Sequence, residues 1–353
     1  MRRVVHLASG REWRGGQRQT WLLARELQRL GVDQRLVTRA GSELARRARA
    51  DGVPVVEVPW SAGLDPRAWW AARRAAREAP ALLHAHDGHA VTLARWAAGD
   101  AVPWIATRRN ASALRHPATW RRARRVIAIS RAVRDQLLHD GVAEERVCIV
   151  PSGIDLEATR AAPHEDLRAW ARLPNGGAVV LTIAALTDEK GLELIPEALR
   201  LLAPGHDVRW VVAGEGPLRA ALVAAARRLG VGERLALPGH HPDPVRLLRG
   251  ADLFVLPSRT EGLGTSVLDA LALEVPVIAT RSGGVLDILE GGAGVLVPVD
   301  DAAALARAVA RLLDDPAARR RGVEAGRHVV AQFTARGMAE RVRAVYASFD
   351  GTL

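Results

Sequence analysis

A single lysine distinguishes one loop of this chain from the rest. The sequence contains 50 Lys and Arg residues, and every one of them except Lys190 is an arginine. Lys190 follows an apolar, β-branched run at residues 178–184 and comes directly before Gly191. An ammonium group is a compact point charge and a guanidinium is a planar fork, so the two suit different ligands. We therefore predict that Lys190 binds a phosphate group; the alternative is an exposed turn that has kept a lysine by chance.

A second stretch combines acidic residues, glycines and the start of a helix. After a predicted strand that ends at Ser258 come Glu261 and then Gly262-Leu263-Gly264, and a helical pattern begins near Thr265. Glycines let the backbone approach a ligand closely, and the first turn of a helix offers free N–H groups to an anion. Asp269 lies one turn further on the same face, within an apolar helix where a carboxylate needs a partner. The stretch predicts a site for hydroxyl groups beside a diphosphate; the alternative is a capped helix with one solvated acid.

The elements that must position these residues are alternating strands and helices. Seven short β-rich runs come first, at residues 4–8, 34–38, 55–59, 81–86, 103–107, 125–130 and 146–150. Residues 151–166 then resemble a linker, and six more runs follow at 178–184, 207–214, 235–239, 253–258, 276–280 and 294–298. Such alternation predicts parallel sheets covered by helices, with ligands beyond the carboxyl ends of the strands. Two such series predict an α/β fold of two doubly wound domains that face each other across a cleft.

The order of several short motifs resembles a known family. The motifs are Gly15-Gly16, HAHDGHA (84–90), VIAISRAVRDQL (126–137), VPSGIDLE (150–157), DEKGLELIPEAL (188–199), VVAGEGPLR (211–219), PVIATRSGG (276–284) and DDPAARRR (314–321). Together they resemble retaining GT-B glycosyltransferases of family 4, of the kind that builds lipopolysaccharide and other bacterial envelope glycans. The family signature of two glutamates separated by seven residues reads Glu261 and Asp269 here, with the spacing kept and the second acid shortened.

The resemblance implies a role for each candidate site residue. The implied catalytic residues are Glu261, which contacts the transferred sugar, Lys190, which holds the donor diphosphate, and His86, which faces the reacting sugar. The implied donor-binding residues are Gly15, Gly16, Lys190, Glu215, His240, Glu261, Gly262, Leu263, Gly264, Thr265 and Asp269, the last at the nucleotide ribose. For His86 the alternative is a packed histidine at a strand end, with His84 and His89 as competitors for its role.

One position departs from the family pattern. The family commonly has an arginine five residues before the lysine as a second cation for the diphosphate, and here that position is Ala185. Either another arginine replaces it, with Arg14, Arg18 and Arg281 as candidates, or the donor binds weakly.

The resemblance also implies the domain organisation. Residues 1–160 would form an acceptor-binding Rossmann-like domain, and residues 161–335 would form a nucleotide-sugar-binding one. Residues 336–353 would form a C-terminal helix that packs back toward the first domain.

The charge of the chain is uneven. Residues 1–163 contain 28 arginines and 16 acidic residues, a net charge of +12, whereas residues 164–353 carry −1. This asymmetry predicts an anionic acceptor in the first domain, with Arg108 and Arg109 as candidate contacts. Trp69 and Trp70 lie among arginines at residues 66–79, a combination that suits an anionic membrane surface. The alternatives are a general enrichment in arginine and an ordinary surface helix that buries one tryptophan.

The resemblance implies transfer of a sugar from a nucleotide-diphosphate sugar, with a UDP-sugar favoured, and the charge asymmetry adds a phosphorylated or lipid-linked saccharide as the acceptor. The sequence has no Asp-x-Asp pair and no cysteine or histidine pattern typical of zinc, so we expect neither a metal nor a cofactor. The alternatives are a nucleotide-sugar epimerase, a GT-B scaffold with weakened catalysis, and a nucleic-acid-binding protein. The last would leave the acidic stretch around Glu261 unexplained.

The single cysteine and the composition bear on location. With Cys148 alone no disulfide can form within the chain, which fits a reducing cytoplasm. We predict a cytoplasmic protein that associates peripherally with the inner face of the cell membrane.

Overall fold

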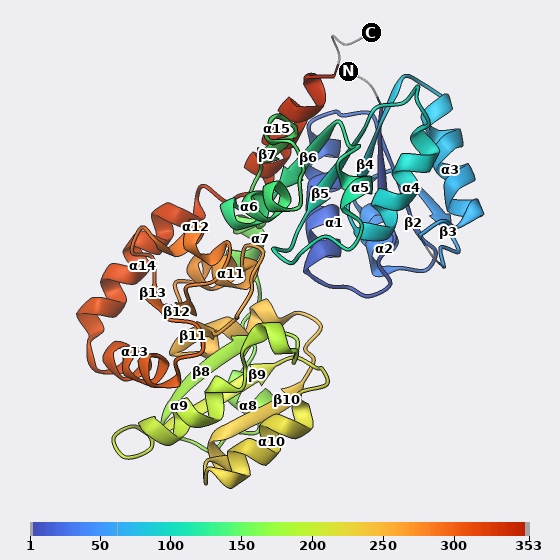
Figure 1. The fold of residues 1–353 in the computed structure, drawn as a ribbon. Coiled ribbons are helices and arrows are strands. Elements are labelled where there is room, and N and C mark those ends of the chain that lie inside the picture. Colours follow the sequence, from blue (N-terminus) through green and yellow to red (C-terminus); the bar gives the residue numbers. More distant parts are fainter. Residues whose placement is uncertain (1–2, 62, 350–353) are drawn as a thin grey trace. The chain divides into compact units, whose positions relative to one another are not determined.

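The computed structural model describes residues 3–61 and 63–349, which divide into two compact units (Figure 1). Unit 1 contains the described residues up to Asp155 together with those from Phe333 onward, and unit 2 is Leu156–Gln332. Both divisions fall within a few residues of the predicted positions 160 and 335. The roles assigned to the two domains stay predictions.

Unit 1 is built on a parallel sheet of seven strands in the order β3-β2-β1-β4-β5-β6-β7. The strands are β1 (Arg3–Ala8), β2 (Gln34–Arg39), β3 (Val55–Val58), β4 (Ala81–Ala85), β5 (Trp104–Arg108), β6 (Arg125–Ala128) and β7 (Val147–Ile149). The direction of winding reverses between β1 and β4, whose Val5 and Leu83 are paired. In such sheets a ligand crevice lies beyond the carboxyl ends of the two strands where the order reverses.

The helices of unit 1 pack on this sheet in two groups. They are α1 (Gly15–Arg29), α2 (Glu43–Ala50), α3 (Pro66–Arg77), α4 (Gly88–Ala98), α5 (Pro117–Trp120), α6 (Arg131–His139) and α15 (Ala335–Ala347), with the 3-10 turn η1 (Glu144–Arg146). α3 packs beside α4, and α1 packs beside α2 and α15. Five of these helices start at a residue whose side chain accepts a backbone N–H bond from the first turn, namely Ser42, Asp65, Asp87, Ser130 and Thr334.

Unit 2 repeats the architecture with six parallel strands in the order β10-β9-β8-β11-β12-β13. The strands are β8 (Ala178–Ile183), β9 (Val208–Ala213), β10 (Leu235–Gly239), β11 (Leu253–Leu256), β12 (Val277–Thr280) and β13 (Val295–Val297). The helices are α7 (Leu156–Ala161), α8 (Leu167–Ala171), α9 (Leu194–Leu202), α10 (Arg219–Arg228), α11 (Thr265–Ala272), α12 (Val285–Leu289), α13 (Ala302–Asp314) and α14 (Pro316–Val330), and the 3-10 turns are η2 (Asp188–Lys190), η3 (Gly232–Arg234) and η4 (Pro244–Gly250). Here the order reverses between β8 and β11. The strand-and-helix alternation read from the sequence is therefore confirmed in both units.

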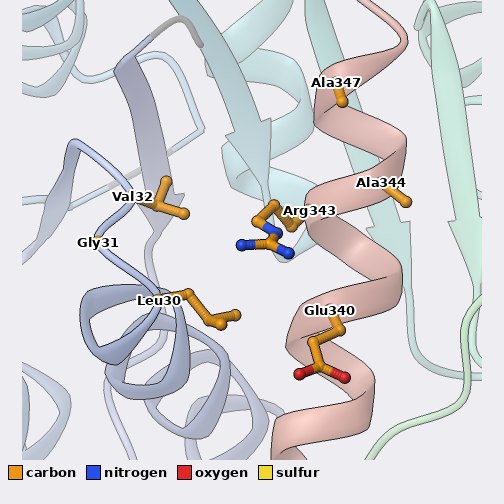
Figure 2. A pocket seen from close by; sticks show the side chains of 7 residues that line it. All are labelled: Leu30, Gly31, Val32, Glu340, Arg343, Ala344 and Ala347. Carbon is orange, nitrogen blue, oxygen red and sulfur yellow. The ribbon is translucent and has the colours of Figure 1, made fainter.

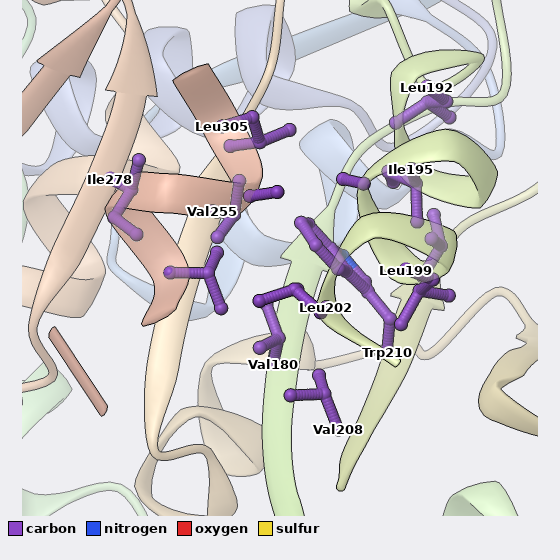
Figure 3. Close-up of a cluster of buried hydrophobic side chains, with 14 of the residues drawn as sticks. Val180, Leu192, Ile195, Leu199, Leu202, Val208, Trp210, Val255, Ile278 and Leu305 are labelled. Atoms are coloured by element: carbon purple, nitrogen blue, oxygen red, sulfur yellow. The ribbon is translucent and has the colours of Figure 1, made fainter. Parts of the chain in front are cut away.

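Each unit has its own hydrophobic core. In unit 2 the buried indole of Trp210 lies among Ile195 and Leu199 of α9 and Val180 of β8 (Figure 3). In unit 1 the C-terminal helix α15 completes the core, because Tyr346 and the apolar residues beside it pack with Leu23 and Leu27 of α1. Burial on both faces explains why the strands read as continuous β-branched runs.

The linker predicted from the sequence contains a short helix. The predicted linker 151–166 is not wholly irregular, because α7 forms within it at Leu156–Ala161, and Leu156 opens unit 2. In the part of the chain that the structure describes, no helix is both long and apolar enough to cross a bilayer.

Candidate functional site

The point where unit 2 reverses its strand order brings Lys190 and Glu261 together. Lys190 ends the turn η2 after β8, and Glu261 lies in the loop after β11, so both sit beyond the carboxyl ends of neighbouring strands. Lys190 Nζ donates to Glu261 Oε2 at 2.7 Å, and Ser258 Oγ donates to the same oxygen at 3.2 Å. The two charged side chains are 20% and 15% exposed, so their charges are only partly screened by water.

Two glycines with left-handed backbone hold these loops against their neighbours. Gly191 has φ 59°, and any Cβ there would collide with the carbonyl oxygen of Pro257. Gly283 has φ 52°, and a Cβ there would collide with the carbonyl oxygen of Glu261, which also accepts the N–H of Gly284 at 3.1 Å. Only glycine allows this close approach of backbones, so the position of the Glu261 loop depends on both.

The helix after Glu261 begins without a side-chain cap. Its N-cap is Gly264 at φ 86°, and among the described residues no side chain caps α11 and no acid lies in its first turn. Gly262, Leu263 and Gly264 are buried, and Thr265 opens the helix. Asp269 follows on the inner side of α11 and is 3% exposed. The free N–H groups of this first turn can therefore bind an anion beside Glu261.

Glu215 and His240 follow the next strands along the same edge of the sheet. The carbonyl of Glu215, just after β9, accepts the N–H of Leu186 at 2.9 Å, so Glu215 borders the loop that leads to Lys190. Its exposed carboxylate lies 2.7 Å from where a Cβ on Gly239 would stand. His240 is exposed at the end of β10, one strand further away.

Arginine candidates for the second diphosphate cation, which Ala185 does not supply, can be compared by the unit in which each lies. Of the three candidates only Arg281 belongs to this unit, where it is exposed at the end of β12; Arg14 and Arg18 belong to unit 1. Arg259 also lies beside the Lys190 loop, but it is paired with Glu193 at 3.1 Å and with Asp300 at 2.7 Å. Its charge is therefore already balanced.

Unit 1 gathers a cluster of histidines at its own reversal point. His6 of β1, His84 of β4 and His86 directly after β4 come together, with His6 Nδ1 2.9 Å from His86 Nε2. His84 Nδ1 lies 2.6 Å from the hydroxyl of Tyr346, and its Nε2 lies 2.7 Å from Thr107 Oγ1. The sequence interpretation missed His6 and Tyr346, because one lies on the paired strand and the other 262 residues from His84.

The hydrogen bonds of this cluster define which ring nitrogens carry protons. Arg109 Nη2 lies 3.3 Å from His86 Nδ1, and a guanidinium can only donate. His86 Nδ1 is therefore an acceptor, so its Nε2 carries the proton and donates to His6 Nδ1. Both ring nitrogens of His86 are thus engaged by the protein, and its side chain is almost fully buried. The prediction that His86 faces the sugar stays untested.

Burial makes the cluster electrically neutral. It lowers the pKa of His6 to about 4, against a hydrogen bond with Gln34 that raises it. The pKa values of His84 and His86 also fall well below the usual range through burial, and through the neighbouring histidines and Arg109. Burial lowers the pKa of Arg109 to about 10, so Arg109 still carries its charge at neutral pH.

The three histidines could in principle hold a metal, since one nitrogen from each lies within 4.8 Å of the others. The sequence showed no such cluster, because the histidines are scattered along the chain. Two features disfavour a cation there: the Arg109 guanidinium borders His86, and both nitrogens of His84 already bond Tyr346 and Thr107. The expectation that the protein uses no metal is untested.

Of the remaining predicted residues of unit 1, Gly16 lies beside Arg109, which borders the histidine cluster, whereas Gly15, Arg108 and His89 have other surroundings. Gly16 lies in the first turn of α1 beside Arg109, whose Cδ would be 3.8 Å from a Cβ at that position, while Gly15 borders open space. Arg108 turns elsewhere: its Nη2 donates to the Ser112 carbonyl at 2.7 Å. His89 is exposed on α4.

Two surface hollows lie away from these strand ends. One, of about 420 Å³, is lined by Leu30 and Val32 after α1 and by Glu340 and Arg343 of α15 (Figure 2). It borders the start of β2, at the amino ends of the strands. A second, of about 400 Å³, borders Ala178 and Asp252 at the starts of β8 and β11. Neither position is one where a doubly wound sheet binds its substrate.

Comparison with known proteins agrees with the motif order. The family profile "Glycosyl transferases group 1" matches residues 164–329, and "Glycosyltransferase Family 4" matches residues 13–158. The chain belongs to glycosyltransferase family 4. The 2-deoxystreptamine glucosyltransferase of Streptomyces kanamyceticus is 33% identical over 54% of this chain and 51% of its own length. A lipopolysaccharide core biosynthesis mannosyltransferase of Rhizobium leguminosarum bv. viciae is 34% identical over 58% of this chain and 60% of its own. The chain thus spans about half the length of the curated relatives it matches.

Solved structures of other proteins share the fold along the whole chain. Anabaena HepE in complex with UDP-glucose superposes with a TM-score of 0.86 at 18% identity, covering 98% of this chain and 100% of that one. A glycosyltransferase from Rickettsia africae superposes with a TM-score of 0.84 at 17% identity, covering 100% of this chain and 99% of that one. These matches confirm the predicted GT-B fold of two Rossmann-like units.

Proposed function

We propose that this protein is a retaining glycosyltransferase that moves a sugar from a nucleotide-diphosphate sugar to a hydroxyl of an anionic or lipid-linked saccharide. The observation that carries the proposal is the Lys190–Glu261 pair beside the uncapped start of α11, at the point where the sheet of unit 2 reverses its order. A cation, a carboxylate and free N–H groups meet there, with Asp269 one turn further along α11, which suits a diphosphate flanked by sugar and ribose hydroxyls.

Each residue of unit 2 has a distinct task in the proposed reaction. Lys190 and the N–H groups from Gly262 to Thr265 bind the donor diphosphate and stabilise the charge that grows on it as it leaves. Glu261 orients the transferred sugar, and Asp269 accepts hydrogen bonds from the ribose. Glu215 and His240 complete the nucleotide pocket.

The chemistry proposed is a front-face transfer that needs no metal. The bond from the anomeric carbon to the diphosphate oxygen breaks, and a bond from that carbon to the acceptor oxygen forms on the same face. The acceptor proton passes to the departing phosphate oxygen, so the leaving group serves as the base.

In unit 1 the tasks proposed are phosphate contact and acceptor binding. Gly15 and Gly16 open α1 where its N–H groups can approach a phosphate, and His86 with Arg109 borders the reacting sugar. The charge of +12 over residues 1–163 favours an acceptor with phosphate or carboxylate groups, held by Arg109. Arg108 would join it only by giving up its hydrogen bond to the Ser112 carbonyl.

The relatives support this class of donor and acceptor. HepE is solved with UDP-glucose, and a Mycolicibacterium smegmatis relative, 35% identical over 51% of this chain, is a GDP-mannose-dependent phosphatidylinositol monomannoside mannosyltransferase. We favour a UDP-sugar donor and an envelope-glycan acceptor such as a lipopolysaccharide precursor. Such an acceptor places the protein in the cytoplasm, peripherally at the inner face of the cell membrane.

A second candidate function follows from Ala185. With one usual diphosphate cation absent, the chain could serve as a GT-B scaffold subunit with weakened catalysis. A nucleotide-sugar epimerase is the other alternative, and it would need no acceptor.

Product analysis separates these functions. The protein is incubated with UDP- and GDP-sugars, with and without a phosphorylated lipid-linked saccharide, and products are identified by mass spectrometry. Transfer that requires the acceptor and is lost in Glu261→Gln supports the proposal. Conversion of the donor sugar without acceptor favours an epimerase, and nucleotide binding without turnover favours the scaffold.

A further inference from the structure

Helix α3 carries its two tryptophans on the face that is exposed to solvent. The side chains that it buries are all alanines, at positions 68, 71, 72, 75 and 76. Trp69 and Trp70 instead point outward, and 36% and 59% of their surfaces are exposed. A helix that serves only its own core would bury its largest apolar side chains. Exposure of both indoles is therefore unexplained by the stability of unit 1.

The neighbouring helix α4 extends the same exposed area. Trp96 is 55% exposed near the end of α4, and its carbonyl accepts the indole N–H of Trp69 at 3.3 Å. Since α3 and α4 pack side by side, the three tryptophans belong to one area of unit 1. Adjacent exposed aromatics of this kind mark interaction sites more often than isolated ones do.

Each exposed tryptophan is covered by an arginine. The guanidinium of Arg73 lies 5.1 Å from the ring centroid of Trp69, that of Arg74 lies 5.4 Å from Trp70, and that of Arg95 lies 5.4 Å from Trp96. These three tryptophans and three arginines form what we call the Trp–Arg surface.

Acidic residues compensate only a small part of the positive charge of this surface. Neither α3 nor α4 contains an Asp or Glu. At its borders, Asp65 is buried and its pKa is held well below the usual range by a hydrogen bond from Arg67. Glu78 is shared between Arg3, Arg35 and, at 3.8 Å, Arg74 of the surface itself, and Asp100 follows α4. The surface is therefore both aromatic and cationic.

We propose that the Trp–Arg surface docks on an anionic lipid bilayer. Indoles prefer the headgroup level, where their rings are buried and their N–H groups stay hydrated, and arginines beside them bind lipid phosphates. A second copy is a poorer occupant, because a two-fold interface through this surface would set arginines against arginines. The inference deepens the proposed peripheral localisation by naming the surface, and it is independent of the donor chemistry assigned to unit 2.

The test uses the full chain and vesicles of defined composition. Binding is measured by co-sedimentation with vesicles of phosphatidylcholine plus phosphatidylglycerol and with vesicles of phosphatidylcholine alone, at low and high salt. We expect binding to the anionic vesicles only, weakened by salt. Replacing Arg73 and Arg74 by Gln should weaken it about five-fold per arginine. Replacing Trp70 and Trp96 by Ser should weaken it about ten-fold or more, since each indole buries its ring at the interface.

A matched control removes the same charge elsewhere. Arg227 and Arg228 form an exposed arginine pair on α10 of unit 2, and their replacement by Gln should leave vesicle binding unchanged. A circular dichroism spectrum and a thermal unfolding curve like those of the wild type show that unit 1 of each variant is folded, and stabilisation by UDP, which reports on unit 2, should persist in every variant. Failure of UDP to stabilise the wild type would contradict the donor proposal without touching this one.

Several results would overturn the inference. These are equal binding to neutral vesicles, no binding to either kind, and the same loss in the α10 control as in the Arg73 and Arg74 variant. Preferential binding to single-stranded oligonucleotides would assign the surface to nucleic acid instead. A concentration-dependent dimer that disappears in the tryptophan variant would assign it to self-association.

Discussion

Replacing Glu261 by Gln should tighten the binding of UDP even though it abolishes transfer. In the structure the Glu261 carboxylate holds the Lys190 ammonium at 2.7 Å, and both side chains are more than three-quarters buried. A diphosphate that binds at Lys190 must compete with this carboxylate and is repelled by its charge. Removal of the negative charge frees the ammonium for the phosphate and leaves the shape of the side chain almost unchanged.

The two partners of the pair should therefore respond in opposite directions. A partly exposed ion pair contributes about 1 kcal/mol, so freeing Lys190 should strengthen UDP binding about five-fold. Replacing Lys190 by Met instead removes charge-assisted hydrogen bonds of about 1.5–3 kcal/mol, so UDP should bind roughly ten- to a hundred-fold more weakly. Opposite signs cannot arise from a general loss of folding.

Titration calorimetry with UDP and with UDP-glucose provides the measurement. Glu261→Gln should bind UDP more tightly but lose part of the extra affinity for UDP-glucose, because Glu261 is proposed to contact the sugar. The control is Glu193→Gln, which removes a carboxylate from the same unit that pairs with Arg259 rather than with Lys190. Its UDP affinity should stay close to that of the wild type. Weaker UDP binding by Glu261→Gln, or unchanged binding by Lys190→Met, would refute the reasoning.

Three further predictions test the architecture around the two sites. Gly283→Ala should destabilise unit 2 by about 2 kcal/mol or more and reduce UDP binding, since φ is 52° and the new Cβ collides with the Glu261 carbonyl. Urea unfolding measures the stability and a UDP titration measures the affinity, and unchanged values would contradict the close approach. The pKa of His6 is lowered to about 4 in the folded protein, against about 6.5 in the unfolded chain. The stability that neutral His6 contributes is therefore complete above pH 6.5 and declines as the pH falls toward 4. The free energy of unfolding should drop by about 2 kcal/mol from His6 alone between pH 7 and 5, and His6→Leu should show a smaller drop. Tyr346→Phe removes the hydroxyl that lies 2.6 Å from His84 Nδ1 and should lower stability by about 1–3 kcal/mol in the same assay. Phe349→Leu, which exchanges one apolar side chain for another in the same core, should leave the pH dependence as it is.

Much of the fold could be predicted from the sequence alone. Strand runs, glycines and helix starts are local features, so the alternation at residues 4–8 through 294–298 indicated two doubly wound units. Lys190 and Glu261 could be proposed as donor-binding residues for the same reason, because each follows the carboxyl end of a predicted strand. The linker at 151–166 was the weaker prediction: its Pro, Gly and acidic residues hid the short helix α7.

Only the tertiary structure decided which distant residues meet. Crossover connections set the strand order, and no local pattern encodes it, so the pairing of Lys190 with a carboxylate 71 residues away could not be read from the chain. The same holds for His6, which meets His86 only because β1 and β4 are neighbours where the winding reverses. The outward position of Trp70 was likewise undetermined, since a helix that carries both alanines and tryptophans can bury either, and packing against the sheet selected the alanines.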